Sequence, residues 1–301
     1  MKSWKKLKPF LKKHQKTVIA LLLIGALVGG YGGWLAHENA IINVTVYDVT
    51  CTGLPAAFKG YRIAQISDLH NTTFGEGNRQ LIDSVRSFHP NIIVLTGDTI
   101  DSRHTDVAAA LQTAQQLQAI APLYYVTGNH EQRIPEEAQR LEEGLTEMGA
   151  EVLHDRSVII RRKGRKIRLI GIDDPNYIDP KKNAFDNSKK VAKKIKNLYK
   201  GTEFTILLSH RPEIYETYCS TGVDMVLAGH AHGGQVRLPL VGAVYCPSQG
   251  WFPRYTEGVI QDGDTTMIVS RGLGQSVVPV RVNNSPELVC IRLHRTEDLS
   301  S

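Results

Sequence analysis

The feature that most constrains this chain is a series of short apolar runs, each followed by side chains that can bind a metal ion. RIAQIS (62–67) precedes Asp68 and His70, NIIVLTG (91–97) precedes Asp98, LYYVTG (123–128) precedes Asn129 and His130, FTILLS (204–209) precedes His210, and MVLAG (225–229) precedes His230 and His232. Apolar runs of this length, bounded by glycine and polar residues, predict buried strands. Because ligands of open α/β sheets bind beyond the carboxyl ends of strands, we expect these side chains to converge on one site.

The segments between the early runs carry helical patterns, at 78–88, 106–120, 135–148 and about 185–199. Further apolar runs at 166–172, 266–270 and 287–293 predict more strands, with another at 42–47 and a hairpin turn around Gly164. Strands that alternate with helices predict an α/β domain with a largely buried sheet. The later strands follow one another more closely, which favours a second or mixed sheet.

The N-terminus combines a basic segment with a long uncharged run. Residues 1–16 contain seven lysines and no acidic residue, and no charged residue follows until Glu38. A helix over 17–37 would be long enough to cross roughly 30 Å of hydrocarbon. Since lysines mark the cytoplasmic flank, residues 1–16 should be cytoplasmic and the remainder extracytoplasmic, in a single-pass membrane protein. A cleaved signal peptide is the alternative, but a good A-x-A cleavage site is lacking, so an uncleaved anchor is favoured.

The charge of the rest of the chain argues against a nucleic-acid partner. Beyond residue 16, the other 29 of the 36 basic residues face 30 acidic ones, a net charge of −1, so the pI of 9.0 reflects the N-terminus alone. The segment 181–200 has eight lysines and could rest on an anionic membrane, although a core-packed helix with a solvated lysine face is favoured. The four cysteines form no C-x-x-C pair, so unpaired buried thiols are expected.

Each polar motif is weak by itself, because Asp68 could cap a turn, Asn129 could occupy a left-handed turn and His210 could be a satisfied core histidine. Five motifs at the ends of five apolar runs together predict a metal site. Mixed carboxylate, amide and imidazole ligands suit Mn²⁺, Fe or Zn²⁺ better than Ca²⁺. Six or seven ligands exceed what one tetrahedral ion takes, which favours two ions.

The motifs occur in an order that resembles the calcineurin-like metallophosphoesterases. They are D-L-H at 68–70, G-D-T-I-D at 97–101, G-N-H-E at 128–131, the lone His210 and G-H-A-H at 229–232. The resemblance covers about residues 61–292. The N-terminal anchor, with CPSQGWFPRYTEG (246–258) and SRGLGQS (270–276), is similar to the membrane-associated bacterial branch that is often grouped with UDP-2,3-diacylglucosamine pyrophosphatases.

This resemblance implies a four-layer αββα sandwich of two mixed sheets after one N-terminal transmembrane helix, with a stalk at 38–60 and the phosphoesterase domain at 61–295. It implies two divalent ions, Mn, Fe or Zn, with Asp98 between them. Asp68, His70 and His232 would bind one ion, and Asn129, His210 and His230 the other. Such a pair can hold a phosphate and activate water for in-line attack.

The remaining polar residues of the motifs have expected roles around the ions. His130 follows a ligand and should turn toward substrate as general acid or transition-state stabiliser. Asp101 and Glu131 are expected to orient ligand imidazoles from behind, although ordinary solvated carboxylates are nearly as good an interpretation. Arg254 and Arg271, in glycine-rich loops, could hold a second phosphate or a headgroup, or could be ordinary surface residues; Arg103 and His104 are similar candidates.

The function expected from these features is cleavage of a P–O bond in a phosphodiester, phosphomonoester or pyrophosphate by a membrane-anchored dinuclear phosphohydrolase. The anchor favours a lipid- or envelope-linked phosphate substrate. A UDP-2,3-diacylglucosamine-type pyrophosphatase is one alternative, but it needs cytoplasmic access, which the lysine-based topology contradicts. The other alternative is a non-catalytic metal-binding envelope module.

Overall fold

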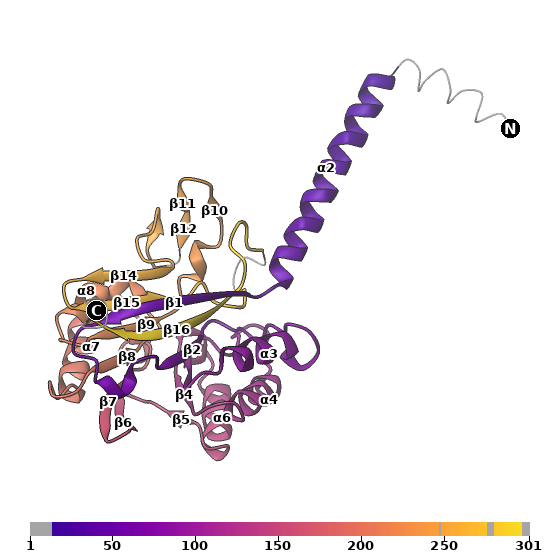
Figure 1. The fold of residues 1–301 in the computed structure, drawn as a ribbon. Helices are drawn as coiled ribbons and strands as arrows, with labels where there is room; N and C mark the ends of the chain where they lie inside the picture. The colour runs from indigo at the N-terminus through magenta and orange to yellow at the C-terminus, as the bar shows by residue number, and fades with distance from the viewer. Residues whose placement is uncertain (1–13, 247, 276–279, 297–301) are drawn as a thin grey trace. The chain divides into compact units, whose positions relative to one another are not determined.

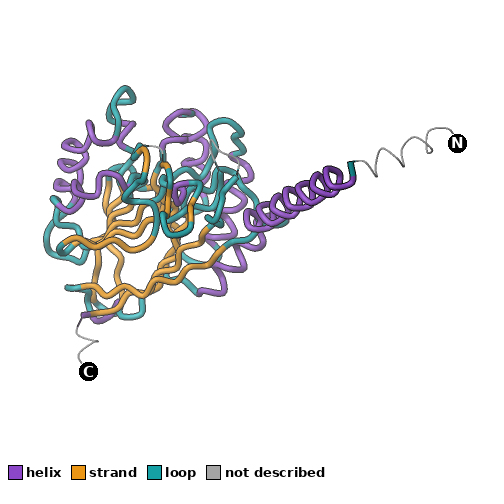
Figure 2. Tube along the Cα trace, turned by 90° about the horizontal axis from the view of Figure 1, so that it is seen from above, coloured by secondary structure: helices purple, strands orange, loops and turns teal. Residues whose placement is uncertain are grey.

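The computed structural model describes residues 14–246, 248–275 and 280–296, and it divides into two compact units, Met1–Ala40 and Ile41–Ser301. In the first unit, α2 (Gln15–Ala40) is a helix of 26 residues that contains the predicted span 17–37. Figure 2 shows α2 as one uninterrupted helix. None of its side chains is buried, and by length and composition it could cross a membrane. The sequence expectation of one long apolar helix is therefore confirmed.

The second unit contains a first sheet of six strands. Their order is β1 (Asn43–Cys51), β16 (Glu287–Arg295), β2 (Arg62–Ile66), β3 (Ile92–Thr96), β4 (Leu123–Val126) and β5 (Glu151–Val152). Strand β16 pairs antiparallel with β2, and every other neighbouring pair is parallel. The carboxyl ends of β2, β3 and β4 therefore lie at the same edge of the sheet.

A second sheet of six strands is mixed as well. Its order is β14 (Gly258–Asp262), β15 (Thr265–Val269), β9 (Met225–Ala228), β8 (Thr205–Leu208), β7 (Arg165–Gly171) and β6 (Arg156–Arg162). The four central strands are parallel, and the outer pairs β14–β15 and β6–β7 are antiparallel. Lys163 and Gly164, both at positive φ, make the predicted two-residue turn between β6 and β7.

Three apolar clusters define four layers (Figure 1). The helices α3 (Arg79–Phe88), α4 (Val107–Gln118) and α6 (Pro135–Glu147) pack on the outer face of the first sheet. The helices α7 (Ala184–Leu198) and α8 (Tyr215–Cys219) cover the second sheet. Between the sheets, Ile63 and Val94 meet Ile206 and Leu227, so the αββα sandwich is confirmed.

Short elements connect these layers. They are the helix α5 (Asn129–Arg133), the 3₁₀ turns η1 (Ala56–Phe58), η2 (Glu76–Asn78), η3 (Pro175–Tyr177), η4 (Pro212–Ile214) and η5 (His232–Gly234), and the two-residue strands β10 (Arg237–Leu238), β11 (Gly242–Ala243), β12 (Tyr245–Cys246) and β13 (Gly250–Trp251). The last four strands form two small antiparallel ribbons, β10–β11 and β12–β13.

The segment expected to be a stalk, 38–60, differs from that expectation. Strand β1 lies inside it and pairs with β16 along all nine of its residues. Val49 and Cys51 of β1 are buried in the cluster between the sheets. The strand predicted at 42–47 is confirmed by β1, but its pairing could not be read from a local pattern, because the partner lies more than 200 residues away in the sequence.

The lysine-rich helix α7 packs through Val191 and Ile195, which are buried in the cluster beneath it. Phe185, near the start of the same helix, is half exposed. This arrangement supports the favoured interpretation of a core-packed helix with a solvated lysine face. All four cysteines are free thiols; three are buried and Cys219 is half-buried.

Candidate metal centre

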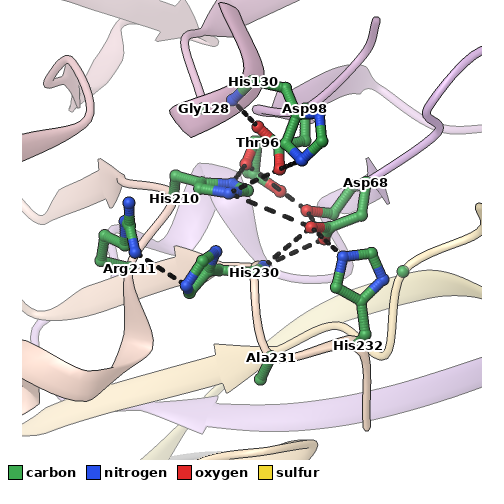
Figure 3. A network of polar contacts seen from close by, with 12 residues as sticks. Asp68, Thr96, Asp98, Gly128, His130, His210, Arg211, His230, Ala231 and His232 are labelled. Carbon is green, nitrogen blue, oxygen red and sulfur yellow. Dashed lines mark hydrogen bonds and ion pairs between the residues drawn. The ribbon is translucent and has the colours of Figure 1, made fainter. Parts of the chain in front are cut away.

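The loops that follow β2, β3, β4, β8 and β9 meet at one edge of the sandwich (Figure 3). They bring together all seven predicted ligands, none more than 6% exposed: Asp68, His70, Asp98, Asn129, His210, His230 and His232. Nε2 of His210 lies 3.3 Å from a carboxylate oxygen of Asp98, and Nε2 of His232 lies 3.4 Å from one of Asp68. The spatial convergence predicted from the strand ends is therefore present.

Two groups of these side chains have the spacing to hold a cation. Asp68, His70 and His232 form one, and Asp98, His210 and His230 form the other, with ligand atoms in each group within 4.8 Å of one another. Oδ2 of Asp98 also lies 3.6 Å from Nε2 of His70. Asp98 thus stands between the groups, where a ligand shared by two ions would have to be.

The backbone is unusual at the site. Asp68, His70, Asp98, His230 and His232 all adopt positive φ, between 47° and 65°. For residues with a Cβ this region is sparsely populated, and such residues persist only where the surroundings hold them. Five of the seven predicted ligands share this conformation, so the fold stores local strain to aim them inward.

Two glycines allow the close approach that the G-H-A-H and G-N-H-E motifs require. A Cβ on Gly229 would lie 1.8 Å from the hydroxyl of Ser67, and one on Gly128 would lie 2.2 Å from a carboxylate oxygen of Asp98. Neither position has room for a side chain. These glycines let the loops after β9 and β4 contact the loops after β2 and β3.

The buried Glu131 holds the backbone around the site together. Its carboxylate accepts hydrogen bonds from the N–H groups of Asp98, Thr99, Ile100 and Gly128, at 2.7 to 3.2 Å. Burial, and then the nearby charge of Asp98, raise the pKa of Glu131 to about 7. Glu131 therefore fixes the loop after β3, rather than an imidazole as the sequence analysis expected.

Asp101 lies behind the imidazoles. Its Oδ2 is 3.3 Å from Nδ1 of His70 and 3.4 Å from Nδ1 of His130. A carboxylate in this position orients a ligand imidazole and fixes its tautomer. Arg103 and His104 donate only backbone N–H groups, to Asp101, and their side chains are exposed.

The donor atoms fit a divalent cation. Among the described residues, Oδ1 of Asn129 and Nε2 of His210 are buried without a hydrogen-bond partner. Nδ1 of His210 lies 2.8 Å from the carbonyl of Thr96, an acceptor, so the neutral ring is protonated there and its Nε2 lone pair faces Asp98. Free amide oxygen, imidazole nitrogen and carboxylate oxygen together are the ligand mixture that Mn, Fe and Zn accept.

The electrostatics of the site point to the same conclusion. Burial, reinforced by Arg211, holds the pKa of His230 well below its usual range, and burial lowers that of His232 to about 3, so both imidazoles are neutral. Burial also opposes charge on His210, but the carboxylates of Asp98 and Asp68 outweigh it and raise that pKa to about 10. The site therefore attracts positive charge, which a bound cation would supply.

His130 lies beside the site, with polar groups near both ring nitrogens. Its Nδ1 lies 3.0 Å from the backbone nitrogen of Ser102 and 3.4 Å from Oδ2 of Asp101, and its Nε2 lies 3.5 Å from Nη1 of Arg133. The same Nε2 lies 4.0 Å from Oδ2 of Asp98. Burial lowers the pKa of His130 to about 4, so the neutral ring is the form present near pH 7.

The two arginines predicted from the glycine-rich loops are bound by carboxylates. Arg254 is 74% exposed and lies 3.5 Å from Glu216, and Arg271 lies 3.3 Å from Glu287. The structure does not bring either guanidinium into the group of candidate ligands, and their binding of substrate stays a prediction.

Sequence analysis missed two buried arginines beside the site. Arg211 binds Asp174 at 2.5 Å, and its Nη1 lies 2.7 Å from Nε2 of His230. Arg281 places Nη2 3.3 Å from Nδ1 of His232. Arg211 could have been noticed because it directly follows the lone His210, whereas Arg281 had no signal in its local sequence.

Comparisons with known proteins agree with this geometry. The model of the calcineurin-like phosphoesterase family matches residues 61–234. The metallophosphoesterase YkuE of Bacillus subtilis is 29% identical over 95% of this chain and 98% of its own. Phosphodiesterase YaeI of Escherichia coli is 27% identical over 77% of this chain and 82% of its own.

A relative from Danio rerio, a transmembrane protein with a metallophosphoesterase domain, is 27% identical over 93% of this chain and 63% of its own. Its name and the helix α2 together suggest a single-pass membrane protein. The grouping with UDP-2,3-diacylglucosamine pyrophosphatases is not confirmed by these relatives. With five loops that converge on two ligand groups and a family model that covers more than half of its length, the chain belongs to the calcineurin-like phosphoesterase family.

Proposed function

We propose that this protein is a membrane-anchored hydrolase that cleaves a P–O bond of a phosphate ester or anhydride at a centre of two metal ions. One observation carries the proposal: seven buried donor residues from five separate loops lie together, and six of them form two groups, with Asp98 close to histidines of both. Asp68, His70 and His232 would hold one ion, and Asn129, His210 and His230 the other. Divalent cations there would supply Lewis-acid activation of water and neutralise phosphate charge.

Three further residues, His130, Asp101 and Glu131, act around the ions in this proposal. His130 acts as a neutral donor from Nε2, which lies 4.0 Å from Oδ2 of Asp98, and its low pKa disfavours an imidazolium. A donor of this kind stabilises negative charge on the transferred phosphoryl group. Asp101 keeps His70 in orientation, and Glu131 keeps the Asp98 loop in place.

The test uses the full chain in detergent, stripped of metal and reloaded with Mn²⁺, Zn²⁺ or Mg²⁺. Hydrolysis of bis(p-nitrophenyl) phosphate and of p-nitrophenyl phosphate is followed for the wild type and for His130→Asn. We expect metal-dependent turnover that falls about 10²- to 10⁴-fold in the variant while bound metal stays constant. The matched control is His89→Asn, which makes the same substitution at an exposed histidine directly after α3. Turnover that is equal in both variants would favour the non-catalytic envelope module.

An exposed apolar rim supports a lipid-linked substrate. On the β10–β11 and β12–β13 ribbons, Leu240, Val241, Trp251 and Phe252 each expose more than half of their surface. Ser248, between β12 and β13, lies 3.2 Å from Nε2 of His230. Apolar tips beside a phosphohydrolase centre suit a substrate with acyl chains.

The rim can be tested with a phosphate ester of a diacyl lipid in vesicles. Trp251→Ser with Phe252→Ser should lower hydrolysis of the vesicle lipid more than that of the soluble diester. Equal losses on both substrates would remove the support for a lipid-linked substrate.

The proposed extracytoplasmic orientation of the domain is tested by protease digestion of intact cells. The protease should degrade the domain, and full protection would place the domain in the cytoplasm.

A further inference from the structure

A second polar feature lies directly beside the candidate metal centre. It is a cleft of about 310 Å³ whose wall includes Asn129 and His230, two candidate ligands. Arg133, Lys181, Lys182 and Arg211 also line it, and we call it the cationic cleft. No acidic side chain lines it among the residues that the structure describes. Asp174 and Glu213 pair with Arg211 from behind and Asp179 lies 4.0 Å from Lys182, but the wall itself presents only cationic and neutral side chains, which favours an anion.

The cationic cleft is assembled from both halves of the sandwich. Arg133 ends the short helix α5 after β4, whereas Lys181 and Lys182 precede α7. Arg211 comes from the loop after β8. These segments meet only in the folded domain, where folding brings Arg133 and Arg211 next to the first two lysines of the segment 181–200.

Arg211 gives the cleft a buried and oriented donor. It is 4% exposed, and Asp174 accepts from its Nε and Nη2, which fixes the plane of the guanidinium. Its Nη1 lies near three acceptors, at 2.7 Å from His230, 3.1 Å from Ser248 and 3.4 Å from Glu213. Planar guanidinium groups held in this way suit the oxygens of a phosphoryl group.

The contact between Arg211 and His230 cannot survive metal binding. A guanidinium only donates, so Nε2 of His230 must accept from it, with the ring proton on Nδ1. Once His230 coordinates a cation, its one lone pair is used and the other ring nitrogen carries the proton. Nη1 of Arg211 then lacks its shortest acceptor and can donate to an anion in the cleft.

We propose that the cationic cleft binds a second phosphoryl group of the substrate, next to the one being hydrolysed. This inference rests on the proposed function, since it places the hydrolysed group at the metal centre. Arg211 donates from the buried wall, and Arg133, Lys181 and Lys182 close around the outer oxygens. The preferred substrate therefore carries two neighbouring phosphoryl groups.

The test compares two ligands that the enzyme cannot hydrolyse. Methylenebisphosphonate has two phosphoryl groups and methylphosphonate has one. Binding to the manganese-loaded full chain in detergent is measured by calorimetry, and each ligand is also tested as an inhibitor of bis(p-nitrophenyl) phosphate hydrolysis. We expect the wild type to prefer the bisphosphonate at least tenfold, roughly the effect of two or three exposed charge pairs.

The variant Lys181→Gln with Lys182→Gln should lower this preference about tenfold. Both lysines are exposed, so the domain should fold normally. The control is Lys189→Gln with Lys190→Gln, which makes the same charge change at exposed positions of α7 outside the cleft and should leave the preference unchanged. A preference that survives in the first variant, or falls equally in both, overturns the proposal.

Two further outcomes separate the possible failures. If methylphosphonate and inorganic phosphate lose as much affinity as the bisphosphonate, the cleft takes free phosphate, and the inference about the substrate is wrong. If the wild type hydrolyses no diester with any metal, yet bisphosphonate binding still depends on Lys181 and Lys182, the proposed function fails while the anion site stands.

Discussion

The space between the two sheets and the edge where their strands end are equally well buried, but with opposite chemistry. Between the sheets, residues such as Ile63, Ile206 and Leu227 are fully buried and apolar. At the edge, the buried side chains are carboxylates, imidazoles and an amide. Apolar burial stabilises the fold without any partner, whereas buried charge needs a counter-charge. Stability and chemistry therefore occupy separate regions, and mutations should affect them separately.

The largest expected effect is on the polar edge. Asp98→Ala removes the carboxylate that stands between the two ligand groups, so we expect hydrolysis to fall by about 10³-fold and bound metal to fall below two ions per chain. Metal analysis and turnover of the same sample measure both. Asp83→Ala, an exposed carboxylate on α3, is the control. Retention of two ions by Asp98→Ala would show that the groups bind metal independently of it.

In the apolar region between the sheets, a substitution should lower stability and leave metal binding unchanged. Leu227→Ala, two residues before Gly229 in the chain, should lower the free energy of unfolding by about 2–5 kcal/mol, because it leaves a cavity between the sheets. Metal content at low temperature should stay the same. Denaturant unfolding with and without metal measures both, and Leu240→Ala, fully exposed, should be neutral. Loss of metal by a folded Leu227→Ala protein would mean that the two regions are coupled.

A smaller effect, on metal affinity, is expected from a substitution of Asp101, which lies behind the candidate ligands. Asp101→Asn keeps the size of the side chain but removes the charge next to His70 and His130. We expect metal affinity to weaken by about 10- to 100-fold, with little change in unfolding. Titration of the metal-free protein against a fluorescent chelator gives the affinity. An unaltered metal affinity would mean that Asp101 does not support the candidate ligands.

The smallest effect concerns a charged contact that water reaches. His154 lies 2.8 Å from Asp173 and 3.1 Å from Glu142, and these carboxylates raise its pKa to about 10. Since this pKa is raised on folding, the contact stabilises fully below about pH 6.5, and the benefit is lost as pH rises through about 10. His154→Gln should lower Tm by about 1–2 °C near pH 6, after screening by solvent.

Near pH 10.5 the His154→Gln variant and the wild type should have the same Tm. A Tm difference that persists at high pH would mean that His154 acts through packing. Either result measures how much this partly exposed charged contact contributes to stability. That contribution can then be compared with the buried site, where the carboxylates need a cation.

Much of this fold could be predicted from the sequence because its signals are local. The apolar runs 62–67, 91–97 and 225–229 each became a strand, with ends shifted by at most one residue. The site followed from them, since parallel strands end at a shared edge. What stayed hidden depends on distant partners. The strand at 42–47 was predicted but its pairing with β16 was not, and the role of Arg211 depends on the fold that places it against His230 and Asp174.

The short connection between α2 and β1 limits how the domain can be separated from its helix. α2 ends at Ala40 and β1 begins at Asn43, so Ile41 and Ile42 are the whole linker, and Ile42 is itself buried. A protease that sheds the domain could reach only the bonds around Ile41, which is exposed, before the buried Ile42. Cleavage further along, before residue 61, would remove β1 and expose the full hydrogen-bonding edge of β16. A fragment shed in that way should aggregate through this open edge rather than persist as a soluble enzyme.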